Sequence, residues 1–343
     1  MKALTKARPE PGAALTEIDT PRLQPNEVLI EVKSGAICGT DVHFYHWDAA
    51  AGNFPVQFPM ILGHEYSGDI VEVGRAVQGL SVGDRVSMET HIPCGKCYSC
   101  GLGNGHNCQD MGLVGMNYPG VFSKYAKAPA KVLFKLPPGV TYEEGSLFEP
   151  AGVAMRGIDE AHISPGDTVV VLGCGPIGLI AIQMALAVGA SQVIGIDLKD
   201  FRLDMAERMG ASILNPSRDN VVERVREACG RRGGADVVLE ISGAAEVYEY
   251  LFDILRLEGR VVTIGHVPRP VSLNISKQIN LRGVSLKGVF GRRIWETWEH
   301  LASLVSAKRI DLAGVITHRF PLEAFEEAFA QVHGQAGKVL FHP

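Results

Sequence analysis

Residues 168–178 read Thr-Val-Val-Val-Leu-Gly-Cys-Gly-Pro-Ile-Gly, an apolar β-branched run that leads directly into three spaced glycines. Such a run predicts a buried strand, and the apolar residues after it predict a helix. Gly173 would allow the tight turn, Gly175 would let the backbone approach a pyrophosphate, and Gly178 would let helix pack on strand. The phosphates would lie at the helix N-terminus, where N–H groups favour negative charge. This stretch predicts a dinucleotide site in a Rossmann-type α/β domain.

Around this stretch, strands that are apolar along almost their whole length alternate with helical segments. Strands are expected at 168–172, 192–196, 235–241, 260–264 and 285–289, and helices at 177–188, 201–209, 220–228 and 245–255. This alternation predicts a doubly wound parallel sheet covered on both faces. From residue 295 onward we expect a helix, a short strand, another helix and a closing strand at 338–341.

The first 150 residues have a different texture, with short β-branched runs such as 27–32 and 67–73 between turns rich in glycine and proline. This texture indicates a β-rich domain of short strands and long loops. We therefore expect two domains in an α/β protein. The β-rich domain would comprise residues 1–152 and 293–343, and the Rossmann domain residues 153–292.

Charge and hydropathy exclude several classes of partner. The net charge of −5 over 343 residues gives no reason to expect a nucleic acid or an anionic membrane as partner. The N-terminus has no apolar core of signal-peptide length, and the longest apolar stretch, 179–190, is too short to cross a bilayer. We expect a soluble, cytoplasmic protein. Clustered cysteines in a reducing compartment indicate metal binding rather than disulfides.

The second predicted strand of the Rossmann domain ends in Asp197, nineteen residues after Gly178. A carboxylate there can accept hydrogen bonds from the adenosine ribose and would repel a 2′-phosphate, which favours NAD over NADP. Arg202 weakens this preference, because an arginine can stack on adenine or meet a phosphate. The alternative for Asp197 is a carboxylate that caps the next helix. The residues expected to bind NAD are Gly173, Gly175, Pro176, Ile177, Gly178, Asp197 and Arg202, with Ile264, Gly265, His266, Val289 and Phe290 at the ends of later strands.

Four cysteines form the most specific metal motif in the chain, C-x2-C-x2-C-x7-C, made of Cys94, Cys97, Cys100 and Cys108. Four thiolates satisfy a tetrahedral zinc completely, so this site would be structural. The alternative is that these cysteines are incidental. A catalytic zinc needs an open position. Its candidate ligands are Cys38 and the pair His64-Glu65. Each motif alone is weak evidence for a metal site, but both occur next to glycines in one β-rich domain, and together they are stronger evidence.

The chain as a whole resembles the zinc-containing medium-chain alcohol dehydrogenases. The resemblance rests on Cys-Gly-Thr-Asp at 38–41, Gly-His-Glu at 63–65, Gly-Asp-Arg-Val at 83–86 and the four-cysteine lobe. It implies a GroES-like catalytic domain beside the Rossmann domain and two zinc ions per chain. Cys38 and His64 would ligate the catalytic zinc, and Glu65 would be an intermittent ligand. Glu149 would be a fourth ligand or a near neighbour, unless it is only a carboxylate at a helix start.

The same resemblance implies a proton relay. Thr40, two residues after the zinc cysteine, would contact the alcohol and pass its proton through the cofactor ribose towards His43. The sequence does not separate the role of His46 from that of His43. Family similarity also implies a homotetramer.

Three segments, 90–94, 117–123 and 291–298, look like the L-threonine 3-dehydrogenase subfamily. This resemblance implies oxidation of L-threonine with NAD to 2-amino-3-ketobutyrate and NADH, through a zinc-bound alkoxide and hydride transfer. Glu149 and His91 could meet the substrate near the zinc, while Arg292 and Arg293 would bind its carboxylate or form subunit contacts. The alternatives are a polyol or 2,3-butanediol dehydrogenase of the same family and, more distantly, a redox-inactive zinc-binding regulator.

Overall fold

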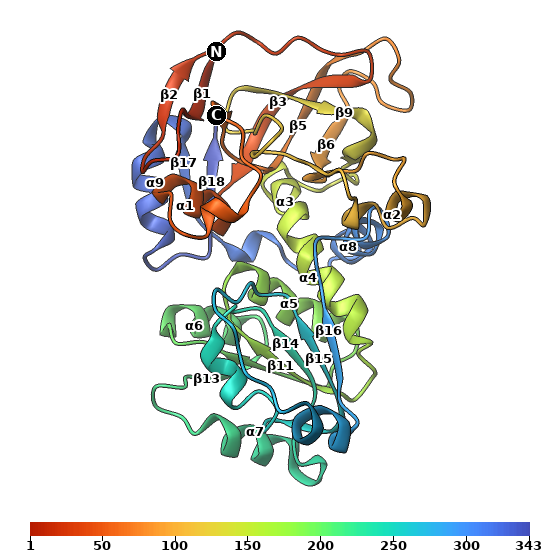
Figure 1. The fold of residues 1–343 in the computed structure, drawn as a ribbon, viewed down its shortest axis with the longest axis vertical. Helices are drawn as coiled ribbons and strands as arrows, with labels where there is room; N and C mark the ends of the chain where they lie inside the picture. The colour runs from red at the N-terminus through yellow and green to blue at the C-terminus, as the bar shows by residue number, and fades with distance from the viewer. The chain divides into compact units, whose positions relative to one another are not determined.

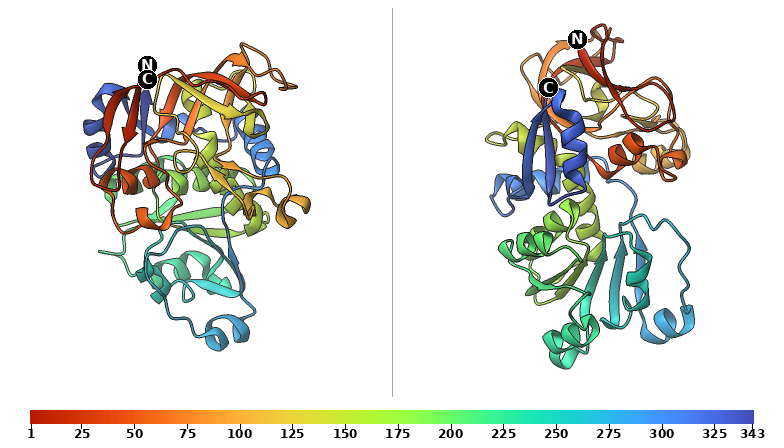
Figure 2. Two further views of the ribbon diagram at one scale, coloured as in Figure 1. Left: turned by 45° about the horizontal axis from the view of Figure 1, so that its top comes forward. Right: turned by 90° about the vertical axis from the view of Figure 1, so that its left-hand side faces the viewer.

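The computed structural model describes every residue from Met1 to Pro343 and divides the chain into two compact units. Unit 1 comprises Met1–Pro150, Arg293–Ser306 and Leu312–Pro343, and unit 2 comprises Ala151–Arg292 and Ala307–Asp311. Both termini belong to unit 1 and lie on the same side of it (Figures 1 and 2). No helix is both long enough and apolar enough to cross a membrane.

Unit 1 is built on a seven-stranded sheet of order β10-β6-β5-β3-β18-β17, with β9 also paired to β3. Its strands are β3 (Glu27–Ala36), β5 (Glu65–Val73), β6 (Arg85–Met88), β9 (Tyr125–Pro129), β10 (Leu133–Lys135), β17 (Ile316–Pro321) and β18 (Lys338–His342). Alternate residues of β3, including Val28, Ile30 and Val32, are buried in one apolar core, as the period of a strand requires. The C-terminal strand β18 pairs antiparallel with β3, so the end of the chain completes this sheet.

Smaller elements surround this sheet. A three-stranded sheet contains β1 (Lys2–Lys6), β2 (Ala14–Glu17) and β4 (Met60–Ile61), and β7 (His91–Ile92) pairs with β8 (Gly112–Leu113). The helices of unit 1 are α1 (Gly39–His46), α2 (Tyr98–Gly101), α3 (Tyr142–Ser146), α8 (Glu296–Ser306) and α9 (Phe325–Val332). Helix α4 (Phe148–Ala161) begins in unit 1 and continues into unit 2.

Unit 2 contains a six-stranded parallel sheet of order β13-β12-β11-β14-β15-β16. The strands are β11 (Thr168–Leu172), β12 (Gln192–Ile196), β13 (Ser212–Leu214), β14 (Ala235–Glu240), β15 (Leu255–Thr263) and β16 (Ser285–Gly288), and the helices are α5 (Pro176–Ala187), α6 (Asp200–Arg208) and α7 (Val221–Cys229). All five residues of β11 are buried, which explains its continuous apolar run. The expected α/β fold, a GroES-like β-rich part with a Rossmann-type sheet, is confirmed.

Asp236 joins three strands of this sheet at their N-terminal ends. Its carboxylate accepts hydrogen bonds from the backbone N–H of Thr168 at 2.8 Å, from Arg232 at 2.8 Å and from Arg256 at 2.6 Å. Burial alone would raise the pKa of Asp236, but these hydrogen bonds and positive charges outweigh it and hold the pKa below its usual value.

Two details of the Rossmann-type sheet differ from the sequence prediction. The expected helix at 245–255 is wrong, because the chain forms only a short 3-10 turn at Ala245–Glu249 and then enters β15 at Leu255. Tyr248, Leu251, Phe252 and Leu255 are buried at a spacing that would also suit one helix face, so the sequence pattern does not distinguish this packed turn from a helix. The three-residue strand β13 was not predicted, because it is too short to show a periodic pattern.

Candidate metal and cofactor sites

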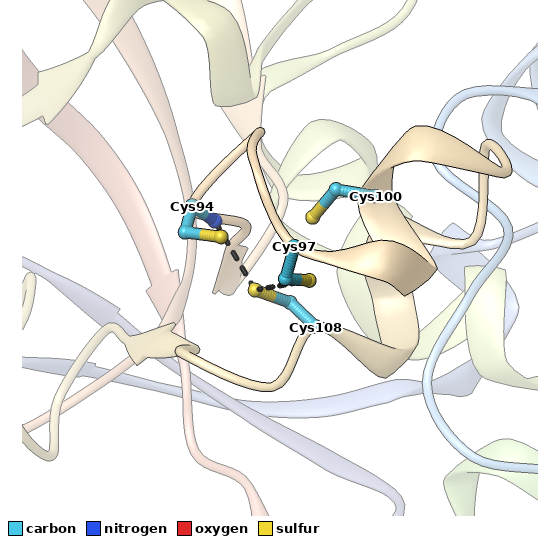
Figure 3. Close-up of side chains that lie close together, drawn as sticks. All are labelled: Cys94, Cys97, Cys100 and Cys108. Atoms are coloured by element: carbon cyan, nitrogen blue, oxygen red, sulfur yellow. Dashed lines mark hydrogen bonds between the residues drawn. The ribbon is translucent and has the colours of Figure 1, made fainter.

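The four cysteines of the C-x2-C-x2-C-x7-C motif gather in the loop around α2 (Figure 3). Their sulfur atoms all lie within 4.8 Å of one another. Backbone N–H groups donate to these sulfurs, from Cys94 to Cys108 at 3.2 Å and from Lys96 to Cys94 at 3.4 Å. Backbone donors also lower the pKa of Cys97 to about 6. Since the N–H groups stabilise negative sulfur, the loop suits a tetrathiolate zinc site with no open position.

A second group of potential metal ligands consists of Cys38, His64 and Glu65, whose ligand atoms also lie within 4.8 Å of one another. Cys38 immediately precedes α1, and Glu65 is the first residue of β5. His64 and Glu65 are buried, while Cys38 is half-buried. A thiolate, an imidazole and a carboxylate form a donor set that zinc accepts, and three protein ligands leave a position open.

Asp41, which the sequence analysis did not assign, connects the two segments that carry these ligands. Its fully buried carboxylate accepts hydrogen bonds from the N–H of Cys38 at 3.0 Å and from the N–H of Gly63 at 3.1 Å. Its Oδ1 atom also lies 3.5 Å from Nδ1 of His64. Burial alone would lower the pKa of His64, but Asp41 and the Cys38 sulfur raise it well above its usual range. The sequence signal that could have indicated this role of Asp41 is its position three residues after Cys38.

Lys338 is a second residue that the sequence analysis missed. This buried lysine begins β18 and donates to Glu65 Oε1 at 2.8 Å, and its Nζ atom lies 2.5 Å from Oε2. Burial raises the pKa of Glu65, Lys338 opposes the shift, and the nearby charge of Glu149 adds to it. Cys38, Glu65, Glu149 and Lys338 thus share one buried electrostatic environment. Nothing in the lysine's local sequence indicates this role, because its partner lies 273 residues away.

Glu149 lies at the start of α4 and is buried, but it does not belong to the group of three ligands within 4.8 Å. Thr90 Oγ1 lies 2.7 Å from Glu149 Oε1, to which it donates, and 3.3 Å from the carbonyl oxygen of His64. On either side of Thr90, Glu89 and His91 interact, with His91 Nδ1 at 2.7 Å from Glu89 Oε1. The segment 89–91 is therefore packed against the candidate catalytic site.

The two proposed relay residues lie on the same short helix. Thr40 and His43 are both in α1, Thr40 half-buried and His43 exposed. His43 contacts Asp48, whereas Nε2 of His46 lies 3.2 Å from Nε2 of His333. The structure thereby gives the two histidines different partners, which the sequence could not do.

A cavity of about 390 Å³ lies at the carboxyl ends of β11, β12 and β14 in unit 2. Its lining contains the predicted residues Gly173, Gly175, Pro176, Ile177, Gly178, Asp197 and Arg202. It also contains residues that were not predicted: Leu172, Ile196, Leu198, Lys199, Pro216, Ile241, Ser242, Ala244, Val247 and Tyr250. Several of these follow the carboxyl end of β12 or β14, the position where ligands of such sheets bind.

The glycine loop has the geometry that a dinucleotide requires. Gly173 has a φ of 96°, and a Cβ atom on Gly178 would lie 1.9 Å from the carbonyl oxygen of Gly173. Gly175 precedes α5, and a Cβ there would meet only Arg202, at 3.9 Å. Helix and strand therefore pack closely, while the space beside Gly175 stays open for a phosphate.

Asp197 accepts hydrogen bonds from two backbone N–H groups, those of Cys174 at 2.8 Å and Lys199 at 2.9 Å. Arg202 lies 3.7 Å from the same carboxylate. Since each carboxylate oxygen has two acceptor sites, these contacts leave capacity for ribose hydroxyls. Asp197 does not cap α6, because that helix has no side-chain cap hydrogen bond and the N–H of Lys199 lies before its first turn.

The later strand ends do not line this cavity. Ile264 is buried, and Gly265 packs so closely on Gly243 that a Cβ would lie 2.3 Å from the Gly243 nitrogen. Phe290 is 51% exposed. Among the candidate substrate residues, Arg292 is buried with its side chain against Gly152, and Arg293 lies 3.3 Å from Glu296 on the surface. His266 and Val289 likewise lie outside the lining.

Comparisons with known proteins agree with this architecture. Residues 24–138 match the model of the alcohol dehydrogenase GroES-like domain, and residues 176–307 match that of the zinc-binding dehydrogenases. An L-threonine 3-dehydrogenase from Bacillus licheniformis is 40% identical over 100% of this chain and 99% of its own. Two solved structures are each 30% identical to this chain and match 100% of it and 99% of their own length. One is a protein described as a zinc-binding dehydrogenase from Sinorhizobium meliloti, bound to NADP, with a TM-score of 0.92. The other is 2R,3R-butanediol dehydrogenase from Bacillus subtilis, with a TM-score of 0.91.

The GroES-like part, the Rossmann-type sheet and the two groups of metal ligands define a zinc-dependent dehydrogenase. The chain belongs to the zinc-containing medium-chain alcohol dehydrogenase family, as its resemblance predicted.

Proposed function

We propose that the chain is an L-threonine 3-dehydrogenase that uses NAD. The observation that carries this proposal is the 40% identity to an L-threonine 3-dehydrogenase over the full length of both chains. The butanediol dehydrogenase, whose structure matches with a TM-score of 0.91, is 30% identical and supports the alternative of a polyol or butanediol substrate. Because fold does not determine substrate, we take the higher identity as support for L-threonine over a diol.

The catalytic zinc site is proposed to use Cys38 and His64, with Glu65 and Glu149 as the exchangeable carboxylates. When bound, zinc would polarise the alcohol and favour loss of its proton. The chain's own residues then have separate tasks. Asp41 holds the segments of Cys38 and His64 together, and Lys338 holds Glu65. The second zinc would be bound by the four cysteines and would stabilise their loop.

The proposed preference for NAD rests on Asp197 beside the glycine loop. A carboxylate at this position repels a 2′-phosphate, although Lys199 and Arg202 line the same cavity and would attract one. The test compares kcat/KM for NAD and NADP in the wild type and in Asp197→Ser. We expect the wild type to prefer NAD and the variant to lose most of that preference. A wild type that prefers NADP would overturn this part of the proposal.

The substrate is tested by measuring NADH formation from L-threonine, sorbitol and 2,3-butanediol under the same conditions. We expect the highest kcat/KM for L-threonine. A higher value for a diol would replace the proposed substrate by the alternative. Loss of activity in Cys38→Ser, with the protein still folded, would exclude a redox-inactive regulator.

The expected homotetramer and cytoplasmic location remain part of the proposal. Strand β16 is an edge strand whose residues are all exposed, and Leu281 and Phe290 near it are 82% and 51% exposed. An exposed edge strand with apolar neighbours favours contact with another subunit. Light scattering on the purified protein should give four times the chain mass of 36.9 kDa. A monomeric mass would contradict the assembly.

A further inference from the structure

The end of helix α1 brings a carboxylate back to the side chain of His43. The helix ends at His46, and Trp47 adopts the left-handed conformation with φ 51° and ψ 51°. The N–H groups of Trp47 and Asp48 both point to the carbonyl oxygen of His43, the second at 3.4 Å. This reversal places Asp48 Oδ2 at 2.6 Å from Nδ1 of His43.

The backbone after the helix fixes the orientation of the Asp48 carboxylate. Its other oxygen, Oδ1, accepts hydrogen bonds from the N–H of Ala50 at 2.9 Å and from that of Ala51 at 3.3 Å. The hydrogen bond from His43 is the main reason that the pKa of Asp48 lies below its usual range. The two oxygens therefore have separate roles, one in the loop and the other at the imidazole.

The contact determines which nitrogen of His43 carries the proton in the neutral ring. An ionised carboxylate can only accept hydrogen bonds, so Nδ1 must be the donor to Asp48. In that tautomer Nε2 has a lone pair and can accept a proton. An Nε2–H tautomer would instead set the Nδ1 lone pair against the carboxylate.

We propose that Asp48 is the positioning residue of the proton relay, holding His43 as the Nδ1–H tautomer so that Nε2 receives the proton leaving the substrate alcohol. This inference rests on the proposed dehydrogenase function and its relay. When the proton arrives, an Nε2–H bond forms, Nδ1–H remains donated to Asp48, and the carboxylate faces the new imidazolium charge. The imidazolium then loses its Nε2 proton to water. His43 and Asp48 side chains are both 46% exposed, so water can take that proton.

The competing interpretation is a surface ion pair that only stabilises the end of α1. Exposed pairs of this kind contribute little to stability. Asp48→Asn separates the two interpretations, because the asparagine Oδ1 can still accept from Ala50 and Ala51. Its NH2 group replaces Oδ2 and donates, so His43 must present the Nδ1 lone pair and carry its proton on Nε2. The substitution therefore keeps the hydrogen bonds of the loop and reverses the tautomer of His43.

The first test does not depend on activity. The full-length protein is labelled with 15N at histidine, and 15N NMR of the ring nitrogens reports which one is protonated, with His43→Gln assigning the signals. We expect Nδ1–H in the wild type and Nε2–H in Asp48→Asn. The matched control is His333→Gln, which removes the imidazole that contacts His46 at the end of the same helix. It should leave the His43 signals unchanged. An unchanged tautomer in Asp48→Asn would overturn the inference.

The second test measures kcat and KM on whichever secondary alcohol the wild type oxidises best. We expect Asp48→Asn to lower kcat at least about 10-fold, within the usual contribution of general acid–base groups, with little change in KM. His333→Gln should keep the wild-type kcat. If His43→Ala loses activity but Asp48→Asn does not, this inference fails while the proposed function stands. If His43→Ala keeps full activity, the proposed relay itself fails.

Discussion

Replacing Lys338 by methionine is expected to destabilise the protein more than any surface substitution. The variant removes the ammonium group that holds Glu65, and both side chains are almost completely buried, at 5% and 1% exposure. At the 2.8 Å separation of Nζ and Oε1 the attraction is about 6 kcal/mol for an effective dielectric constant near 20. Desolvation of the two charges offsets much of this attraction in the wild type.

The variant loses the attraction but keeps the desolvation penalty of the carboxylate. Removing one partner of a buried ion pair typically costs about 3–5 kcal/mol. We expect a loss of this size in the free energy of unfolding, measured by urea denaturation at one protein concentration and without added zinc, so that no metal ion compensates Glu65. Lys338→Arg, which keeps a cation, should lose less.

The double variant Lys338→Met/Glu65→Gln provides the decisive control. If the loss comes from an uncompensated carboxylate, neutralising Glu65 should recover a large part of it, so the two changes will not be additive. Two outcomes would refute the reasoning. One is a loss below about 1 kcal/mol in Lys338→Met, which is the level of an exposed ion pair. The other is a double variant whose loss equals the sum of the single ones.

Three further predictions concern the metal sites and the Rossmann-type sheet. Thr90→Val keeps the shape of the side chain but removes the donor to Glu149, and it should weaken zinc binding at the catalytic site about 10-fold or more in chelator competition. Thr90→Ser, which keeps the hydroxyl, should bind zinc as the wild type does. Unchanged zinc affinity in Thr90→Val would count against this role of Thr90. Cys97→Ser should reduce bound zinc from two per chain to one in elemental analysis and should lower the melting temperature. Cys38→Ser should retain the structural zinc. Two zinc ions per chain in Cys97→Ser would contradict the four-cysteine site. Because the folded state lowers the pKa of Asp236, its stabilisation is present above the unfolded-state pKa of about 3.9 and is lost as pH falls through the folded value. The difference in unfolding free energy between wild type and Asp236→Asn should therefore shrink from pH 6 towards pH 3, and a constant difference would contradict this assignment.

The fold was largely predictable because its strongest signals are local. The run at 169–172 is apolar throughout, and the structure buries all of β11. The helices expected at 177–188, 201–209 and 220–228 appear as α5, α6 and α7, shifted by about one residue. The failure at 245–255 has a tertiary cause. Apolar residues there fill a packed turn before β15, and their sequence does not reveal which neighbours they meet.

The sequence by itself determined the chemistry of the ligands and the glycine loop. Four cysteines within fifteen residues and three glycines after an apolar strand carry their geometry in their spacing, because a short loop restricts where its side chains can lie. The subfamily resemblance likewise came from contiguous segments.

Only the tertiary structure decided which residues support those ligands. Lys338 meets Glu65 across 273 positions of sequence, and Thr90 meets Glu149 across 59. Such pairs depend on the pairing of β18 with β3 and on the contact of Thr90 with the start of α4, so no local pattern contains them. Even the partner of His43 required the left-handed turn at Trp47, because a backbone reversal and not the spacing alone brings Asp48 to the ring. Burial makes the Lys338–Glu65 and Thr90–Glu149 contacts energetically important, since a buried polar group that loses its partner is costly.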